Sequence, residues 1–197
     1  MDLRLDGKVA LVTGGSKGIG REIATAYAQS GAKVMITSRK ADACELAALE
    51  IGNGCEWYAS NVGYEDQVES LVDHTLDTFG AIDILVNNAG ANPYAGPTID
   101  VDVPRWDKTI QVNMTAPLVL TQLCWNKYMK ESKGDCSIIN ISSVGGLTTN
   151  EQLGVYDVAK AGLIHLTKQL AAELGPKVRV NCIAPGLIKT DFRSEER

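Results

Sequence analysis

Two residues that can move a proton together, Tyr156 and Lys160, stand four positions apart. The surrounding sequence predicts a helix, and residues at this spacing share a helical face, so the phenol and the ammonium can point at one site. A neighbouring ammonium stabilises the phenolate and lowers the pKa of the phenol. The phenol can then act as a general acid near neutral pH. Taken alone, the pair also fits an ordinary Tyr and Lys on an amphipathic helix.

Polar and small residues end the two predicted strands that precede this helix. Ser142 and Ser143 end one of them, where a hydroxyl can donate to a substrate oxygen as charge develops on it. The run Asn87–Gly90 ends the other, and Gly90 lets a nucleotide approach the backbone. Turn-forming serines and a simple Asn-Gly turn are the alternatives when either motif is taken alone.

A glycine-rich turn, Thr13–Gly20, follows the first predicted strand and opens the first predicted helix. Its glycines allow a tight turn and let a pyrophosphate reach the backbone, while the helix N-terminus offers free N–H groups and a partial positive charge. The spacing Gly14, Gly18, Gly20 differs from the more widespread G-x-G-x-x-G pattern. Its place directly after the first strand favours a nucleotide site over a purely structural turn.

The residues after the second strand indicate which nicotinamide cofactor is used. An acidic residue about 20 positions beyond the turn would bind the ribose 2′-hydroxyl of NAD. Here the chain reads Ser38-Arg39-Lys40 instead. Arg39 can bind a 2′-phosphate with two parallel hydrogen bonds, and Lys17 can approach the same phosphate. We therefore predict NADP(H), with solvated surface cations as the alternative.

Short apolar runs alternate with amphipathic segments along the whole chain, as α/β folds require. The predicted strands cover 9–13, 33–38, 55–60, 82–90, 137–142 and 178–186, and the predicted helices cover 18–30, 41–51, 65–79, 105–131 and 154–174. The strands are apolar on both faces, which is typical of a parallel sheet covered by helices. The pattern predicts one domain over 1–197, a doubly wound α/β fold of Rossmann type with ligands at the carboxyl ends of its strands.

Composition excludes several classes of function. The formal net charge of -5 offers no global positive field for nucleic acid or an anionic membrane. No apolar run approaches the length of a signal peptide or a membrane span. The five cysteines include no C-x-x-C pair, so we expect neither a metal site nor a disulfide framework, and a cytoplasmic location.

Together these motifs resemble those of short-chain dehydrogenases/reductases, in the same order and over nearly the whole chain. The residues that carry the resemblance are Thr13–Gly20, Asn87–Gly90, Asn113, Ser143, Tyr156, Lys160, Pro185 and Gly186. The resemblance implies hydride transfer between a nicotinamide and a carbonyl or alcohol carbon. Tyr156 would protonate the carbonyl oxygen, and Lys160 would lower its pKa and hold the nicotinamide ribose. Ser143 would polarise the substrate oxygen, and is preferred over Ser142 because its distance from Tyr156 along the chain is the family's usual one.

The resemblance also implies that Asn113 is a fourth catalytic residue. Pro117 lies four positions later and has no N–H to donate to the Asn113 carbonyl. If the segment is helical, that carbonyl is freed for a water that could link Lys160 to solvent. A plain helix kink at Pro117 is the alternative.

A cofactor site drawn from the ends of the strands follows from the same resemblance. Its predicted residues are Gly14, Ser16, Lys17, Gly18, Ile19, Gly20, Ser38, Arg39, Asn61, Val62, Asn88, Ala89, Gly90, Tyr156, Lys160, Pro185, Gly186, Ile188 and Thr190. Relatives often carry Asp-Val beside the adenine where this chain has Asn61-Val62. The Asn61 amide can still accept and donate hydrogen bonds, so we expect no change of function there.

The substrate-facing segments 91–97 and 145–154 suggest a partly apolar pocket. The overall sequence resembles 3-oxoacyl-carrier-protein reductase-like members, which implies a 3-oxoacyl thioester. Three lysines could then meet an acyl carrier protein, although solvated helix lysines explain them equally well: Lys127, Lys130 and Lys133. Ala172 stands where such a reductase is expected to place a cation, which weakens this reading. A general ketone reductase or alcohol dehydrogenase of a small-molecule substrate is the alternative.

Members of the family continue past the Pro-Gly turn to a seventh strand, whereas this sequence ends at Arg197. We therefore expect a sheet without the family's final strand, whose sixth strand is an unpaired edge. The alternative from another class is a truncated nucleotide-binding protein with little catalysis. The resemblance further implies a homodimer or homotetramer, formed through the 105–131 and 154–174 helices.

Overall fold

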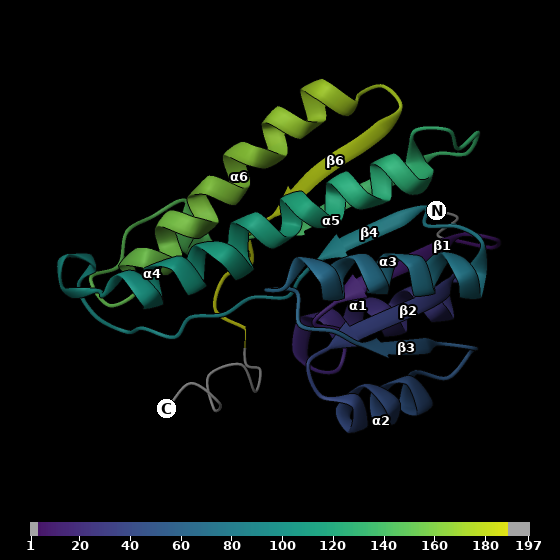
Figure 1. Cartoon of the computed structure of the whole chain (residues 1–197), viewed down its shortest axis with the longest axis horizontal. Helices are drawn as coiled ribbons and strands as arrows, with labels where there is room; N and C mark the ends of the chain where they lie inside the picture. The colour runs from purple at the N-terminus through teal and green to yellow at the C-terminus, as the bar shows by residue number, and fades with distance from the viewer. Residues whose placement is uncertain (1–3, 189–197) are drawn as a thin grey trace.

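The fold is built on one sheet of six parallel strands, seen in a computed structural model that describes residues 4–188 (Figure 1). The strands lie in the order β3-β2-β1-β4-β5-β6. Their bounds are β1 Val9–Thr13, β2 Lys33–Ser38, β3 Glu56–Ala59, β4 Ile84–Asn87, β5 Cys136–Ile141 and β6 Val178–Ile183. Every pairing is parallel. The predicted six-stranded α/β sheet is confirmed.

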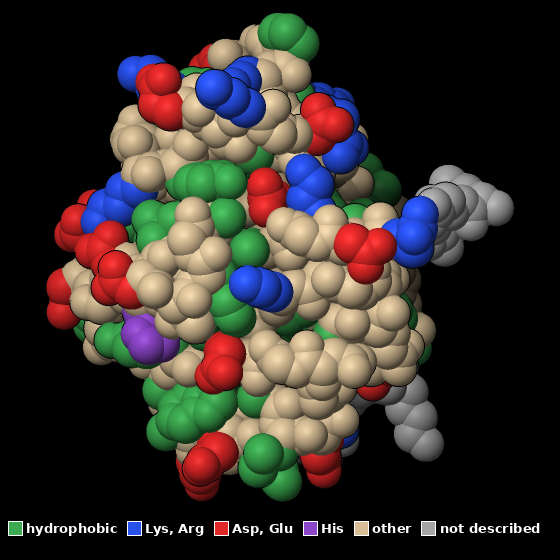
Figure 2. Space-filling view, turned by 90° about the vertical axis from the view of Figure 1, so that its right-hand side faces the viewer, with side chains coloured by type: hydrophobic (Ala, Val, Ile, Leu, Met, Phe, Trp, Pro, Cys, Tyr) green, Lys and Arg blue, Asp and Glu red, His purple; other side chains and the backbone are tan. Residues whose placement is uncertain are grey.

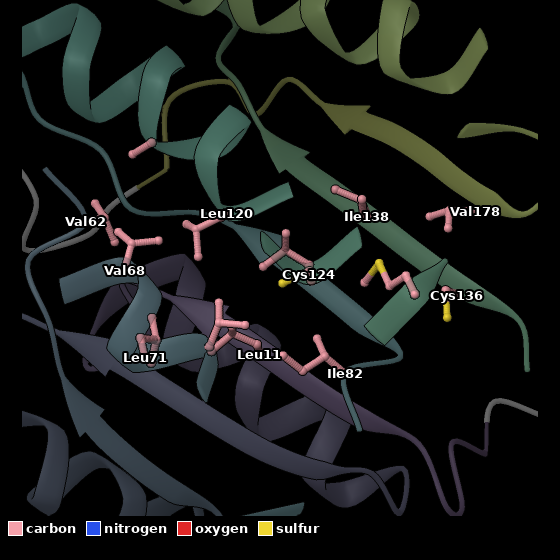
Figure 3. Packing of buried hydrophobic residues seen from close by; sticks show 14 of the residues in the cluster. Leu11, Val62, Val68, Leu71, Ile82, Leu120, Cys124, Cys136, Ile138 and Val178 are labelled. Carbon is pink, nitrogen blue, oxygen red and sulfur yellow. The ribbon is translucent and has the colours of Figure 1, made fainter. Parts of the chain in front are cut away.

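Helices pack on both faces of this sheet. Their bounds are α1 Gly18–Gln29, α2 Ala41–Ile51, α3 Glu65–Phe79, α4 Val103–Ile110, α5 Ala116–Cys124 and α6 Gly154–Leu174. Apolar residues of α1 and α2 form a core against one face, and those of α3, α5 and α6 form a core against the other. Figure 3 shows this second core, in which Leu11 and Ile138 of the sheet face Leu71 and Leu120 of the helices.

Alternation along the strands explains why both faces are covered. On β1, Leu11 enters one core while Ala10 and Val12 enter the other, and all three are fully buried. The edge strand β6 is different: Val178 and Val180 are buried, but Arg179, Asn181 and Ile183 are not. Within residues 4–188, β6 lies at one end of the sheet order and pairs only with β5.

The long predicted helix over 105–131 is helical from Val103 to Met129 but is not a uniform α-helix. It contains two π-helical turns, η2 (Gln111–Thr115) and η3 (Trp125–Met129). In η2 the Ala116 N–H donates to the Gln111 carbonyl, five residues back. The next residue, Pro117, has no N–H, so the α-helical ladder is interrupted here. The helix begins at Val103 because the Asp102 side chain accepts the Arg105 N–H and caps it.

Predicted and observed boundaries differ most at the C-terminal ends of two strands, where each predicted strand runs three residues too far. β4 ends at Asn87 rather than at Gly90, because the next residue turns back to hydrogen-bond the end of β1. β6 ends at Ile183, short of Pro185. Two short 3-10 helices were not predicted, Thr98–Asp100 (η1) and Val144–Gly146 (η4), since three-residue elements carry no periodic pattern.

All five cysteines are free thiols, and burial raises the pKa of Cys124 to about 12. Within residues 4–188, no group of three or more His, Cys, Asp or Glu side chains could hold a metal ion. The described helices include none with the length and apolarity needed to cross a membrane.

Candidate active site and nucleotide cleft

A cavity of about 530 Å³ opens at the carboxyl edge of the sheet, where residues that follow all six strands meet. Its volume lies within the roughly 300–1,000 Å³ of small-molecule sites. The predicted cofactor residues that line it are Gly14, Ser16, Lys17, Gly18, Ile19, Ser38, Arg39, Asn61, Val62, Asn88, Ala89, Gly90, Tyr156, Lys160, Pro185, Gly186 and Ile188. Gly20 does not line the cavity, and Thr190 lies outside the described residues. The tertiary structure thus gathers the predicted residues into one cleft.

Asn88 fastens the glycine turn to the end of β4. Its side-chain amide donates to the Thr13 carbonyl at 2.9 Å, and the Thr13 hydroxyl accepts the N–H groups of Asn88 and Ala89, each at 3.0 Å. A Cβ on Gly14, whose φ is +66°, would stand 2.8 Å from this amide, and one on Gly20 would overlap it. Gly20 therefore allows close packing rather than contact with a ligand. Thr13 was missed as a positioning residue, although a polar residue ending an apolar strand is a usable signal.

The glycine turn and the end of β2 together suit the phosphates of a dinucleotide. No side chain caps the N-terminus of α1, so the first N–H groups of this helix face the cleft without a side-chain acceptor. Lys17 and the exposed Arg39 line the same region. Among the described residues that line the cavity, Asp157 is the one carboxylate, and it packs against Gly145 on the substrate side. This donor set fits a phosphorylated, anionic cofactor.

Lys108 also lines the cleft, which sequence reasoning did not predict. Its ammonium lies 5.6 Å from the centre of the Tyr64 ring. Residue 108 could not be assigned to the cleft beforehand, because the face that α4 presents to the strand ends depends on how the helix packs.

Tyr156 and Lys160 project from the first two turns of α6 toward the cleft, as their spacing predicts. The Lys160 ammonium lies 5.6 Å from the centre of the Tyr156 ring and donates to the Ile141 carbonyl at 2.9 Å. Lys160 is 3% exposed, and this burial lowers its pKa to about 8. The arrangement places a buried cation beside a half-buried phenol.

The two serines after β5 have different environments. The Ser142 hydroxyl is buried and donates to the Lys160 carbonyl at 2.9 Å, so it fastens β5 to α6. The Ser143 hydroxyl is half-buried, accepts the Gly145 N–H at 3.1 Å and lines the cleft. Because a hydroxyl can accept one hydrogen bond while donating another, the Ser143 hydroxyl can still donate its hydrogen to a ligand oxygen.

Asn113 lies within the π-helical turn η2, fully buried and outside the lining of the cleft. Its amide nitrogen donates to the Ala91 and Thr109 carbonyls at 2.6 and 2.8 Å, and its oxygen accepts the Ala91 N–H at 3.4 Å. Its side chain therefore fixes the turn after β4, where a Cβ on Gly90 would lie 3.0 Å from the Asn113 oxygen. The water relay through the Asn113 carbonyl stays a prediction.

Comparison with known proteins decides the family. Residues 8–197 match the family described as short chain dehydrogenase. The chain is 42% identical over 193 residues to dehydrogenase/reductase SDR family member 4 of Sus scrofa, covering 95% of this chain and 68% of that protein. It is 41% identical to the human dehydrogenase/reductase SDR family member 2, mitochondrial, with the same coverage. The chain belongs to the short-chain dehydrogenase family.

Solved structures agree with this membership. A short chain dehydrogenase/reductase family protein superposes with a TM-score of 0.88 at 36% identity, covering 100% of this chain and 80% of that one. A short-chain type dehydrogenase/reductase from Mycobacterium ulcerans gives 0.90 at 32% identity, covering 96% and 71%. This short-chain dehydrogenase is thus an oxidoreductase, of a family that uses nicotinamide nucleotides and acts on small molecules. The named relatives do not support the finer resemblance to 3-oxoacyl-carrier-protein reductases.

The lysines considered for a carrier protein lie far from the cleft of this short-chain dehydrogenase. Lys127 already contacts Glu69 and Asp73 of α3, at 2.9 and 2.6 Å. Lys130 and Lys133 lie in the turn between the helix that ends at Met129 and β5, which places them at the amino edge of the sheet, opposite the cleft. Figure 2 views this end of the molecule, where basic and acidic side chains are interspersed rather than gathered into a basic patch. The expected docking of an acidic carrier protein on these lysines is therefore not supported.

Proposed function

We propose that this short-chain dehydrogenase reduces a ketone to an alcohol with NADPH, with Tyr156 as the general acid. The observation that carries the proposal is the meeting of Tyr156, Lys160 and Ser143 at one end of a cleft whose other end holds the glycine turn and Arg39. A protein that only binds nucleotides has no need for a buried ammonium beside a phenol, because burying an ammonium costs free energy.

Each residue has a definite task in this proposal. A nicotinamide bound in the cleft supplies the hydride for the carbonyl carbon. The Ser143 hydroxyl donates to the carbonyl oxygen, and the Tyr156 phenol delivers the proton that turns this oxygen into a hydroxyl. The Lys160 ammonium stabilises the phenolate that remains. Lys17, Arg39 and the free N–H groups of α1 bind the phosphates, and Gly90 lets the cofactor approach the backbone.

The substrate end of the cleft favours a ketone with an apolar substituent. Its lining includes Ala91, Val144, Leu153 and Leu187, and Lys160, the one cation there among the described residues, is buried against the Ile141 carbonyl. The test follows NADPH absorbance with apolar ketones, a diketone and a 3-oxoacyl thioester. Turnover of the ketones supports the proposal. Cofactor binding without turnover of any carbonyl would favour the non-enzymatic alternative. A clear preference for the thioester would instead favour a 3-oxoacyl thioester as the substrate.

The preference for NADPH is expected to depend on Arg39. In Arg39→Asp, the carboxylate repels a 2′-phosphate and can accept from a 2′-hydroxyl, so we expect kcat/KM with NADPH to fall by about 100-fold relative to NADH. Lys40→Asp makes the same charge change at the next residue, which does not line the cleft, and serves as the control. Steady-state rates with both cofactors measure the ratio. Equal efficiency of the unaltered protein with NADH and NADPH would contradict the assignment.

The two serines are expected to respond differently to the loss of their hydroxyls. Ser143→Ala removes the donor to the substrate oxygen, so kcat/KM should fall by about 100-fold. It also removes the acceptor of the Gly145 N–H, but this bond is only half-buried, so stability should fall by no more than in Ser142→Ala. Ser142→Ala should leave kcat/KM within about threefold but lower the free energy of unfolding by about 1 kcal/mol, because it breaks the bond to the Lys160 carbonyl. Rates and urea unfolding of both variants test this, and the reverse pattern would reassign the catalytic serine.

Assembly and location remain predictions. The proposal includes association as a homodimer or homotetramer through the helical segment 105–131, which covers most of α4 and all of α5, and through α6. It also includes a cytoplasmic location. Mass determination by light scattering tests the first, and imaging of the tagged protein tests the second.

A further inference from the structure

Asp157, the residue after Tyr156, is a buried carboxylate to which the proposed reaction gives no task. Its side chain is 6% exposed, and burial raises its pKa. One oxygen, Oδ2, accepts the Asn150 N–H at 3.1 Å. The other, Oδ1, is buried with no hydrogen-bond partner among the described residues. A half-satisfied carboxylate is costly in this environment, so its presence requires a physical explanation.

The unsatisfied oxygen packs against the segment that carries Ser143. A Cβ on Gly145 would overlap Oδ1 of Asp157, so the backbone of Gly145 lies directly on the carboxylate. The N–H of Gly145 in turn donates to the Ser143 hydroxyl at 3.1 Å. Asp157 therefore sets the position of Gly145, whose N–H orients the Ser143 hydroxyl.

The satisfied oxygen holds a second segment of the pocket lining, at Asn150. Asn150, held by Asp157, accepts the Gln152 N–H on its side chain at 2.8 Å and the Leu153 N–H on its carbonyl at 3.1 Å. The Gln152 carbonyl then accepts the Gly96 N–H at 3.0 Å. This chain of hydrogen bonds joins Asp157 to Gly96, in the same segment as Ala91 and Asn92, which line the cleft.

We propose that Asp157 is a positioning residue that fixes both walls of the substrate pocket, the Ser143–Gly145 segment and the Asn150–Leu153 turn, relative to Tyr156. The inference rests on the proposed function. Tyr156 and Asp157 are neighbours on α6, so any shift of the walls away from Asp157 is also a shift away from the phenol. The glycine turn and Arg39 lie at other strand ends, so cofactor affinity does not depend on this contact.

Three variants test the proposal. Asp157→Ala removes both contacts, and we expect KM for the ketone to rise about tenfold while kcat changes less and the Kd for NADPH stays within about twofold. Asp157→Asn keeps an oxygen for the Asn150 N–H and is expected to restore KM. Val158→Ala, at the next and half-exposed residue, is the control. An unchanged KM in Asp157→Ala, or an Asn variant no better than the Ala variant, would overturn the proposal.

Amide hydrogen exchange tests the same contact without turnover. The amides of Gly145 and Asn150 are expected to exchange about tenfold faster in Asp157→Ala than in the unaltered protein, with no change in Val158→Ala. Equal exchange would overturn the inference. If the unaltered protein reduces no ketone, the proposed function fails, yet the exchange rates still decide the part played by Asp157. Asp157→Ser, which is too short to reach Asn150, gives the same readout if the Ala variant does not fold.

Discussion

Tyr156→Phe is expected to lower kcat for ketone reduction about 1,000-fold, within the range that a positioned general acid contributes. The variant keeps the ring that lies 5.6 Å from the Lys160 ammonium and loses only the hydroxyl, so packing at the start of α6 should not change. NADPH affinity should stay within about threefold, because the phosphates bind at the other end of the cleft. Rates and fluorescence titration with NADPH measure the two effects separately.

Tyr27→Phe is the matched control, since this half-buried tyrosine of α1 does not line the cleft. It should leave both kcat and NADPH affinity unchanged. If the Tyr156→Phe protein retained more than about a tenth of the activity, Tyr156 would not be the general acid, and another group in the cleft would have to supply the proton.

Lys160→Met is expected to lower kcat/KM about 100-fold or more, because the ammonium that stabilises the phenolate is lost. Its effect on stability should depend on pH. Burial lowers the pKa of Lys160 to about 8, from 10.5, so the folded protein favours the neutral amine. Below pH 8 the residue is protonated in both states, and the whole cost of burying the charge is present.

Between pH 8 and 10.5 the unfolded chain binds this proton and the folded chain does not, so the stability of the unaltered protein rises with pH. Relative to Lys160→Met, the gain across this range should be about 3 kcal/mol, and it should be absent below pH 8. Denaturant unfolding of both proteins at several pH values measures the difference. A stability difference between the two proteins that does not vary with pH would show that Lys160 is not held as a buried cation.

Parts of this site could be predicted without coordinates because they depend on local spacing. Four positions along a helix place Tyr156 and Lys160 on one face whatever the helix packs against. The glycine turn after β1 needs backbone freedom that few residues other than glycine supply, so Gly14 was recognisable in the sequence. The choice of Ser143 over Ser142 rested on resemblance, and the structure added a physical reason, since the Ser142 hydroxyl donates to the Lys160 carbonyl.

Other parts depended on contacts between residues distant in sequence. Lys108 reaches the cleft because the face of α4 that carries it packs toward the end of β3. Thr13 contributes through its hydroxyl, which accepts the N–H groups of two residues 75 and 76 positions later in the chain. Lys127, Lys130 and Lys133, which could have met a carrier protein, precede β5 and so lie at the opposite edge of the sheet. Asp157 carries no signal in the sequence, because its contacts with Gly145 and Asn150 form only when the residues after β5 pack against α6.

The sequence by itself determined the alternation of strands and helices, the family, and most of the predicted residues that line the cleft, because periodicity and motif spacing are local properties of a chain. The tertiary structure decided how those residues are used. Burial lowers the pKa of Lys160 and makes the Ser142 hydroxyl less exposed than that of Ser143, and long-range hydrogen bonds hold Asn113, Thr13 and Asp157 in place. Burial and long-range contacts arise only when the chain packs, and no spacing along the sequence encodes them.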